Sequence, residues 1–227
     1  FEYTVLPMGL CNAPSTFMQL MNETFRNLLD KSVLCFLDDI LIFSRTREEH
    51  LQHIRQVLER LRKNKLYAKF SKCELMRDEV QFLGHRLGAN GLAVAPDKVA
   101  AVRDWKPLRD VSDVRSFLGL AGFYRRFVKG FSELAKPLTD LTQEKVAWTW
   151  AAPQQQAFQA PKDALSSAPV LIIPDPAKPF TLNCDACDFA VGATLQQDHG
   201  QGLQPVAYRS RKVTPPERDP DTRGKGF

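Results

Sequence analysis

The stretch CFLDDILIFS, from Cys35 to Ser44, sets two adjacent carboxylates, Asp38 and Asp39, in the middle of an apolar run. β-Branched and aromatic residues lie on both sides of the pair, and such residues favour strands. The stretch therefore predicts a β-hairpin with both acids at its bend. An ordinary turn explains one aspartate, because Asp is common in turns, but it explains less well why a second stands beside it without a glycine.

A bound cation is one explanation for the pair. Burying an ionised carboxylate is unfavourable unless a positive charge neutralises it, and the nearest basic residue on the C-terminal side is Arg45. Magnesium takes oxygen ligands from one or two carboxylates and completes its shell with water and phosphate oxygens. Two such ions hold the attacking and leaving oxygens in nucleotidyl transfer. The aspartates therefore indicate a candidate metal site for phosphate chemistry.

The composition limits the class of protein and of partner. The 227 residues suffice for one or two domains, and 44% of them are hydrophobic, without a continuous apolar run of about 18 residues that could cross a membrane. A net charge of +5 permits a polyanionic partner without requiring one. Scattered cysteines indicate reduced thiols, and no signal peptide is visible, so we expect an intracellular protein, cytoplasmic or nuclear. Because the chain begins with Phe1 rather than Met, we expect a fragment.

Two smaller clusters suggest metal binding only weakly. Cys184 and Cys187 form a C-x-x-C without a second pair nearby, so two ordinary thiols are favoured over a zinc or redox site. His50 and His53 lie one turn apart on a predicted helix without a third ligand, and we expect a solvated helix face there.

Periodicity and capping residues predict a mixture of helices and strands around the hairpin. Thr46, with Glu49 three residues on, forms a capping box at the start of one of the helices. Gly119 and Gly122 lie inside a predicted helix, where each costs about 1 kcal/mol relative to alanine, so either another helix or a ligand should approach this backbone. Pro161 interrupts another helical pattern. The predicted helices cover residues 14–28, 46–61, 96–105, 112–131 and 154–167, and the predicted strands cover residues 33–36, 40–43, 79–87, 179–197 and 202–213.

Several stretches in a fixed order resemble one known family. They are LPMGLCNAPSTF (residues 6–17), FLDD (36–39), FLGH (82–85), VRSFLGLAGFYRRFVKGFS (114–132), and APVLIIPDPAKPFTLNCDACDFAVGATLQQ (168–197) followed by PVAYRSRK (205–212). Their order and spacing resemble the reverse transcriptases of gypsy-class long-terminal-repeat retrotransposons over nearly the whole chain. The resemblance implies an RNA-directed DNA polymerase with a ribonuclease H region.

The resemblance also implies a fold and its division. It is an α+β fold in which residues 1–88 form a partial polymerase palm and residues 89–150 form the thumb. A connector (151–178) precedes a truncated ribonuclease H-like α/β domain (179–227). The implied partners are an RNA template, a DNA primer, deoxynucleoside triphosphates and an RNA–DNA hybrid, and no oligomeric state follows.

The resemblance assigns roles to individual residues. The implied catalytic and metal-binding residues, with two Mg²⁺ ions in each active site of the intact enzyme, are Asp38, Asp39 and Asp185. The implied nucleotide and template pocket contains Pro7, Met8, Gly9 and Phe36, the primer grip contains Phe82, Leu83, Gly84 and His85, and the nucleic-acid track contains Gly119, Gly122, Arg125 and Arg126.

Three departures from the family leave the activity of the chain open. The third polymerase carboxylate would precede Phe1, Gly226 stands where a ribonuclease H glutamate is expected, and Pro161 interrupts a helix that is continuous in the family. We therefore expect neither unaided polymerisation nor hybrid cleavage. The alternative is a domesticated or decayed, non-catalytic nucleic-acid-binding module; a simple metal nuclease is disfavoured, because Asp38 and Asp39 lack nearby partner acids.

Overall fold

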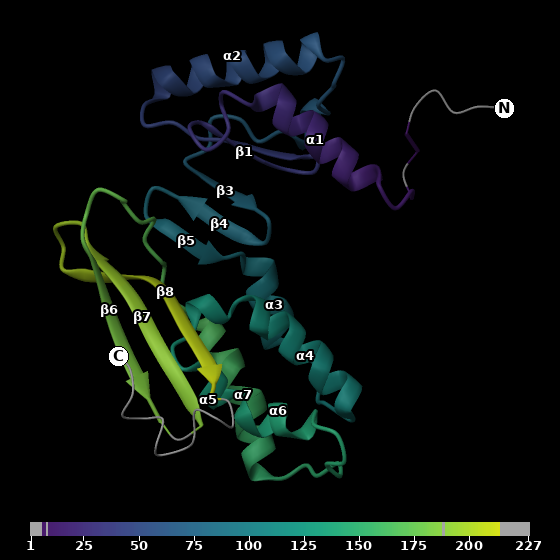
Figure 1. The fold of residues 1–227 in the computed structure, drawn as a ribbon, viewed down its shortest axis with the longest axis vertical. Helices are drawn as coiled ribbons and strands as arrows, with labels where there is room; N and C mark the ends of the chain where they lie inside the picture. Colours follow the sequence, from purple (N-terminus) through teal and green to yellow (C-terminus); the bar gives the residue numbers. More distant parts are fainter. Residues whose placement is uncertain (1–5, 8, 188, 214–227) are drawn as a thin grey trace. The chain divides into compact units, whose positions relative to one another are not determined.

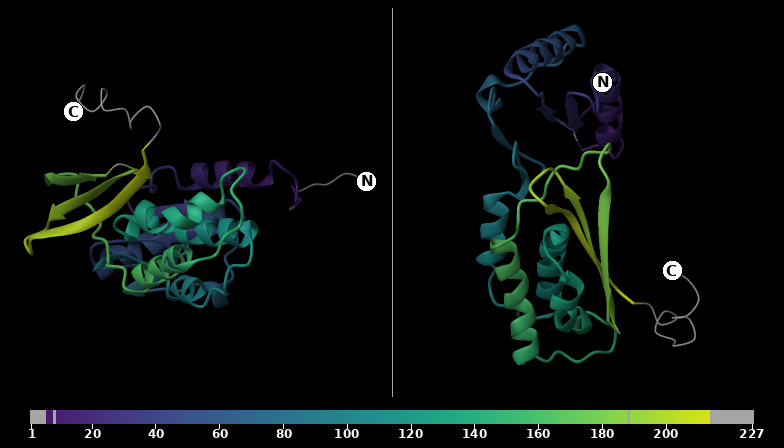
Figure 2. Two further views of the ribbon diagram at one scale, coloured as in Figure 1. Left: turned by 90° about the horizontal axis from the view of Figure 1, so that it is seen from below. Right: turned by 90° about the vertical axis from the view of Figure 1, so that its left-hand side faces the viewer.

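The computed structural model describes residues 6–7, 9–187 and 189–213, and the chain divides into two compact units, Phe1–Phe82 and Leu83–Phe227 (Figures 1 and 2). Each unit has its own hydrophobic core. Among these residues, no helix combines the length and the apolar character needed to span a bilayer. The mixed α+β class predicted from the sequence is confirmed.

The first unit packs two helices on a β-hairpin. The elements are α1 (Ala13–Phe25), β1 (Val33–Phe36), β2 (Asp39–Ile42), α2 (Arg47–Lys63), the 3₁₀ turn η1 (Phe70–Lys72) and β3 (Glu79–Phe82). The predicted N-cap of α2 is confirmed, because Thr46 Oγ accepts a hydrogen bond from the Glu49 N–H at 3.2 Å. The buried core residues are Met21, Phe25, Leu28, Val33, Val57 and Leu61. This core holds the hairpin that carries the paired aspartates.

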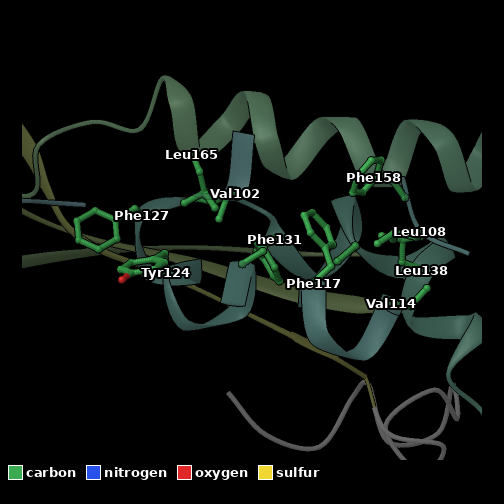
Figure 3. Packing of buried hydrophobic residues seen from close by; sticks show 14 of the residues in the cluster. Val102, Leu108, Val114, Phe117, Tyr124, Phe127, Phe131, Leu138, Phe158 and Leu165 are labelled. Atoms are coloured by element: carbon green, nitrogen blue, oxygen red, sulfur yellow. The ribbon is translucent and has the colours of Figure 1, made fainter. Parts of the chain in front are cut away.

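The second unit combines a small helical core with one antiparallel pair of strands and one three-stranded antiparallel sheet. Its elements are β4 (His85–Gly88), β5 (Gly91–Val94), α3 (Pro96–Arg103), α4 (Val111–Phe123), η2 (Arg125–Phe127), α5 (Phe131–Leu134), α6 (Lys136–Leu141), α7 (Ala152–Ser166), β6 (Phe180–Ala186), β7 (Ala190–Asp198) and β8 (Leu203–Lys212). Phe117 of α4 lies at the centre of the core, with its ring edge-to-face on Phe158 of α7 at 4.9 Å (Figure 3). Strands β6, β7 and β8 form an antiparallel sheet in that order.

Three local expectations are wrong. The predicted helix 112–131 ends at Phe123, because Tyr124 caps it and the chain then turns Phe127 into the core. The predicted strand 79–87 is two strands, since Leu83 and Gly84 both have positive φ (50° and 77°). Pro161 does not break its helix: α7 is continuous and buries the ring, which compensates part of the lost backbone hydrogen bond.

Candidate active site and nucleic-acid surface

The β1–β2 hairpin presents the two aspartates at its bend. Phe36 pairs with Asp39, so Leu37 and Asp38 form the two-residue turn and Asp39 begins β2. The predicted hairpin is therefore confirmed. Both carboxylates are exposed, however, and the expectation that they lie in an apolar environment is wrong. Water stabilises them at the bend, so their charge alone does not require a cation.

The backbone at this bend is strained, and a residue of helix α1 is hydrogen-bonded to it. Leu37 has φ of 52°, a left-handed conformation that costs about 1–2 kcal/mol for a residue with a side chain. Its N–H donates to Sδ of Met18 on α1, and the Cys35 thiol donates to its carbonyl at 3.6 Å. Strained residues persist where the surrounding structure fixes them, and they cluster at functional sites. The bend that carries the aspartates is such a place.

The aspartates concentrate negative charge near β1. The pKa of the Cys35 thiol is raised, first by burial and then by the charges of Asp39 and Asp38. Two adjacent carboxylates offer the oxygen ligands that Mg²⁺ prefers. Within the described ranges, no three His, Cys, Asp or Glu side chains are grouped closely enough to hold a metal ion by themselves. The donor chemistry fits Mg²⁺, with phosphate and water oxygens completing its shell.

The residues of the implied nucleotide pocket are partly described. Phe36 is 51% exposed and lies directly across the hairpin from Asp39. Pro7 is half-buried, and Gly9 has φ of 101°, a conformation that favours glycine. Met8 lies outside the described residues.

The implied primer grip includes a tight aromatic cluster in the second unit. The His85 ring stacks on Phe123 at 5.9 Å with planes 10° apart and meets the edge of Tyr124 at 5.6 Å. Burial and the neighbouring Arg126 charge lower the pKa of His85, so the ring is neutral at pH 7. A Cβ at Gly84 would come within 2.6 Å of the Tyr124 hydroxyl, so only glycine fits there. Phe82 ends β3 and belongs to the first unit.

The surface of α4 near its C-terminus is open. A Cβ added at Gly119 or Gly122 would meet nothing within 4 Å, so no helix of the described chain packs closely on either glycine. Phe123, which the sequence analysis missed, is 61% exposed beside them. Arg126 is also exposed. An aromatic residue four positions after Gly119 was the signal that could have identified Phe123, since i and i+4 share a helix face.

The two predicted arginines differ in environment. Arg126 extends into solvent, with its guanidinium carbon 6.0 Å from the Phe127 ring centre. Arg125 is half-buried and donates through Nη2 to Ser132 Oγ at 3.0 Å and to the Ser210 carbonyl. Burial and the charge of Arg209 lower its pKa. The guanidinium of Arg125 is therefore occupied by hydrogen bonds within the protein, to Ser132 and Ser210.

The candidate ribonuclease H residue lies on an edge strand. Asp185 is exposed on β6, opposite Gly192 of β7. Asp188 and Gly226 lie outside the described residues. Cys184 and Cys187 are exposed free thiols, and the Cys187 thiol donates to the Ala190 carbonyl at 3.5 Å.

The expectation of a solvated histidine pair is wrong. Nδ1 of His50 and Nδ1 of His53 both lie within hydrogen-bond distance of Ser44 Oγ, at 3.2 and 2.7 Å. All three side chains are half-buried. The pair therefore ties the first turns of α2 to the chain just after β2.

Comparison with known proteins identifies two regions of the chain. Residues 1–87 match the model of reverse transcriptase (RNA-dependent DNA polymerase), and residues 150–226 match that of the RNase H-like domain found in reverse transcriptase. The chain is 35% identical over 215 residues to the Transposon Tf2-3 and Tf2-4 polyproteins of Schizosaccharomyces pombe (strain 972 / ATCC 24843). These alignments cover 94% of this chain but only 16% of each polyprotein.

Solved foamy viral structures share the fold. The protease-reverse transcriptase dRH in complex with ds DNA is 27% identical, with a TM-score of 0.84, over 94% of this chain and 37% of that chain. The protease-reverse transcriptase in complex with an RNA/DNA hybrid is 27% identical, with a TM-score of 0.79, over 95% of this chain and 29% of that chain. The chain thus belongs to the reverse transcriptases that carry an RNase H-like domain, and it is related to the Tf2 retrotransposon polyproteins.

Proposed function

We propose that this chain is the part of an RNA-directed DNA polymerase that presents two metal-binding aspartates and holds a base-paired duplex. In this assignment residues 1–88 are a partial palm, 89–150 the thumb, 151–178 a connector and 179–227 part of a ribonuclease H-like domain. The observation that carries the proposal is the strained β1–β2 bend with Asp38 and Asp39 side by side in solvent. A two-residue hairpin turn needs a positive φ, and this turn places two carboxylates side by side, where they offer Mg²⁺ the oxygen ligands that it prefers.

Asp38 and Asp39 would hold Mg²⁺, the ion that this family generally uses. Bound there, the metal would stabilise negative charge on the phosphate oxygens during nucleotidyl transfer. The chain's own contribution is to keep the bend in place through Met18 and to keep Phe36 across the hairpin from Asp39. Asp185 would act in the same way on an RNA–DNA hybrid.

The α4 surface formed by Gly119, Gly122, Phe123 and Arg126 is the proposed duplex surface. Without side chains at the two glycines, the helix backbone can approach a groove closely. Phe123 offers an apolar ring for sugar or base contacts, and Arg126 offers a charge for a phosphate. The foamy viral relatives are solved with ds DNA and with an RNA/DNA hybrid, so a hybrid primer–template is the ligand to test.

Metal binding tests the aspartate assignment directly. Mn²⁺, used as a paramagnetic substitute for Mg²⁺, should bind the chain in a titration followed by electron paramagnetic resonance, and Asp38→Asn should weaken this binding. Asp110→Asn is the matched control, because that carboxylate caps α4 by accepting the Asp113 N–H at 2.8 Å. Equal Mn²⁺ binding by the chain and by Asp38→Asn would contradict the assignment.

Duplex binding tests the α4 surface. Fluorescence anisotropy with a labelled hybrid primer–template over a range of salt concentrations should give a linear plot of log affinity against log salt. Arg126→Ala should reduce the slope by about 0.9, the value for one phosphate contact on a DNA duplex. Arg103→Ala is the control, since Arg103 Nε already pairs with Asp104 at 2.9 Å.

A second candidate is a nucleic-acid-binding module without catalysis. It is favoured by the lack of a three-ligand cluster among the described residues. Duplex binding without any Mn²⁺ binding at Asp38 would favour this candidate over the polymerase.

A further inference from the structure

Arg125 lies at a joint between the α4 region and strand β8. Its Nη2 bonds both the Ser132 hydroxyl, just inside α5, and the backbone carbonyl of Ser210 on β8. The Ser132 N–H in turn donates to the Ser210 hydroxyl at 2.9 Å. Ser210 is only 3% exposed. Three hydrogen bonds therefore link Arg125, Ser132 and the buried Ser210 to one another.

A second contact fastens the same strand to α6. Asp140 accepts from Lys212 Nζ at 2.8 Å through one oxygen and from Lys136 Nζ at 2.7 Å through the other. Burial alone would raise the pKa of Asp140, but these two hydrogen bonds hold it below its ordinary value. The carboxylate is therefore charged at neutral pH and attached to both α6 and β8.

The chain between α7 and β6 is hydrogen-bonded to strand β5 and to strand β8 as well. Leu171 exchanges two backbone hydrogen bonds with Leu92 of β5, at 2.7 and 2.8 Å. A Cβ at Gly91 would collide with the Leu171 carbonyl, so the close approach needs glycine. The Ile172 N–H then donates to the Pro205 carbonyl of β8 at 2.9 Å.

Gln197 of β7 is hydrogen-bonded to the last residues of this segment, just before β6. Its side chain is fully buried and bonds the Asp175 N–H, the Asp175 carbonyl and the Lys178 carbonyl at 2.8, 2.8 and 3.0 Å. A flexible linker would leave these backbone groups to water. The sheet is thus bonded to the helical core at Ser210 and at Lys212, and to residues 172–178 at Pro205 and at Gln197.

We propose that Arg125 is a positioning residue that fastens β8 to the η2–α5 turn, so that the α4 surface and the Asp185-bearing sheet keep one fixed separation. The meaning of that separation for a bound duplex rests on the proposed function, but the fastening does not. The guanidinium is suited to the position because one planar group reaches two acceptors at once. Arg125 and Arg126 are thus adjacent in sequence but have different tasks.

Distance measurement by double electron–electron resonance tests the fastening. Spin labels are attached at Cys184 on β6 and at Ser116→Cys on the exposed face of α4, with the other four cysteines replaced. The parent and Arg126→Ala should each show one narrow distance distribution, and Arg125→Ala should show a broad one. A broad distribution in the parent, or an unchanged one in Arg125→Ala, would overturn the proposal.

Milder variants keep the test decisive if Arg125→Ala does not fold. Ser210→Ala removes only the acceptor of the Ser132 N–H and should raise hydrogen exchange at that amide by about tenfold. Arg125→Lys keeps the charge but replaces the planar guanidinium, whose Nη2 bonds both acceptors, with an ammonium on a more flexible stem, so its distribution should be intermediate. Unchanged exchange at the Ser132 amide in Ser210→Ala, together with a distribution as narrow as the parent's in Arg125→Lys, would overturn the proposal.

Duplex binding separates this inference from the proposed function. Arg125→Ala should keep the parent's salt slope, whereas Arg126→Ala should lose about 0.9. An equal loss in Arg125→Ala would mean that Arg125 contacts a phosphate, and it would overturn the positioning role. If neither variant changes the slope, the α4 surface is not the duplex surface, and the distance distributions still decide the fastening.

Discussion

Replacing Gly119 and Gly122 by alanine should make the protein more stable and a poorer duplex binder. Both glycines lie in α4, where glycine is less favourable than alanine by about 1 kcal/mol per residue. Neither new methyl group would meet an atom within 4 Å, so no clash offsets this gain. The free energy of unfolding of the double variant should therefore be about 2 kcal/mol higher than that of the parent, and its melting temperature should be higher by roughly 5 °C.

The same methyl groups should hold the helix away from a nucleic-acid groove. Urea unfolding followed by circular dichroism measures the stability, and anisotropy with the hybrid primer–template measures the binding. We expect affinity for the hybrid to fall about tenfold, equivalent to about 1.4 kcal/mol. Stability and binding should thus change in opposite directions.

Gly130→Ala is the matched control for this experiment. Gly130 has φ of 64°, where alanine is strained by about 1–2 kcal/mol, so the same substitution should destabilise the protein. If the double variant at α4 were less stable than the parent, the open helix face would be wrong. If it were more stable and bound the hybrid equally well, the glycines would not serve duplex binding.

Two further predictions concern buried polar groups in the second unit. Gln197→Ala should lower the free energy of unfolding, measured by urea denaturation, by about 2–4 kcal/mol, because three backbone groups of Asp175 and Lys178 lose their hydrogen bonds. Gln196→Ala, at the half-buried neighbouring residue, is the control and should change this free energy little. Burial, chiefly, lowers the pKa of His85, so the unfolded chain binds a proton at this residue more tightly than the folded protein does. The free energy of unfolding should therefore fall as the pH drops below about 6.5, and the fall should stop once the pH is below the lowered pKa of the folded state. His85→Phe should abolish this pH dependence.

Local pattern was enough to predict the hairpin and the helix caps. The β-branched and aromatic residues around Asp38 and Asp39 and the Thr46–Glu49 spacing depend on neighbours in sequence, which the sequence displays directly. The two aspartates were placed at the correct bend, although their exposure was not foreseen.

Features that depend on distant residues could not be predicted from the sequence. The partner of Arg125 is 85 residues away, so nothing nearby distinguishes it from the exposed Arg126. The helix ends at Phe123 because Tyr124 and Phe127 have places in the core, which only tertiary packing creates. The buried Pro161 ring likewise offsets an interruption that local propensity alone would count as decisive.

The raised pKa of Cys35 has a consequence for the chemical reactivity of the protein. Thiolates, not thiols, attack alkylating agents and are oxidised by peroxide, so a thiol held protonated by burial and by two neighbouring acids reacts slowly. The other four cysteines are all exposed. A limiting amount of iodoacetamide should therefore modify those four first and leave Cys35 of the hairpin unmodified.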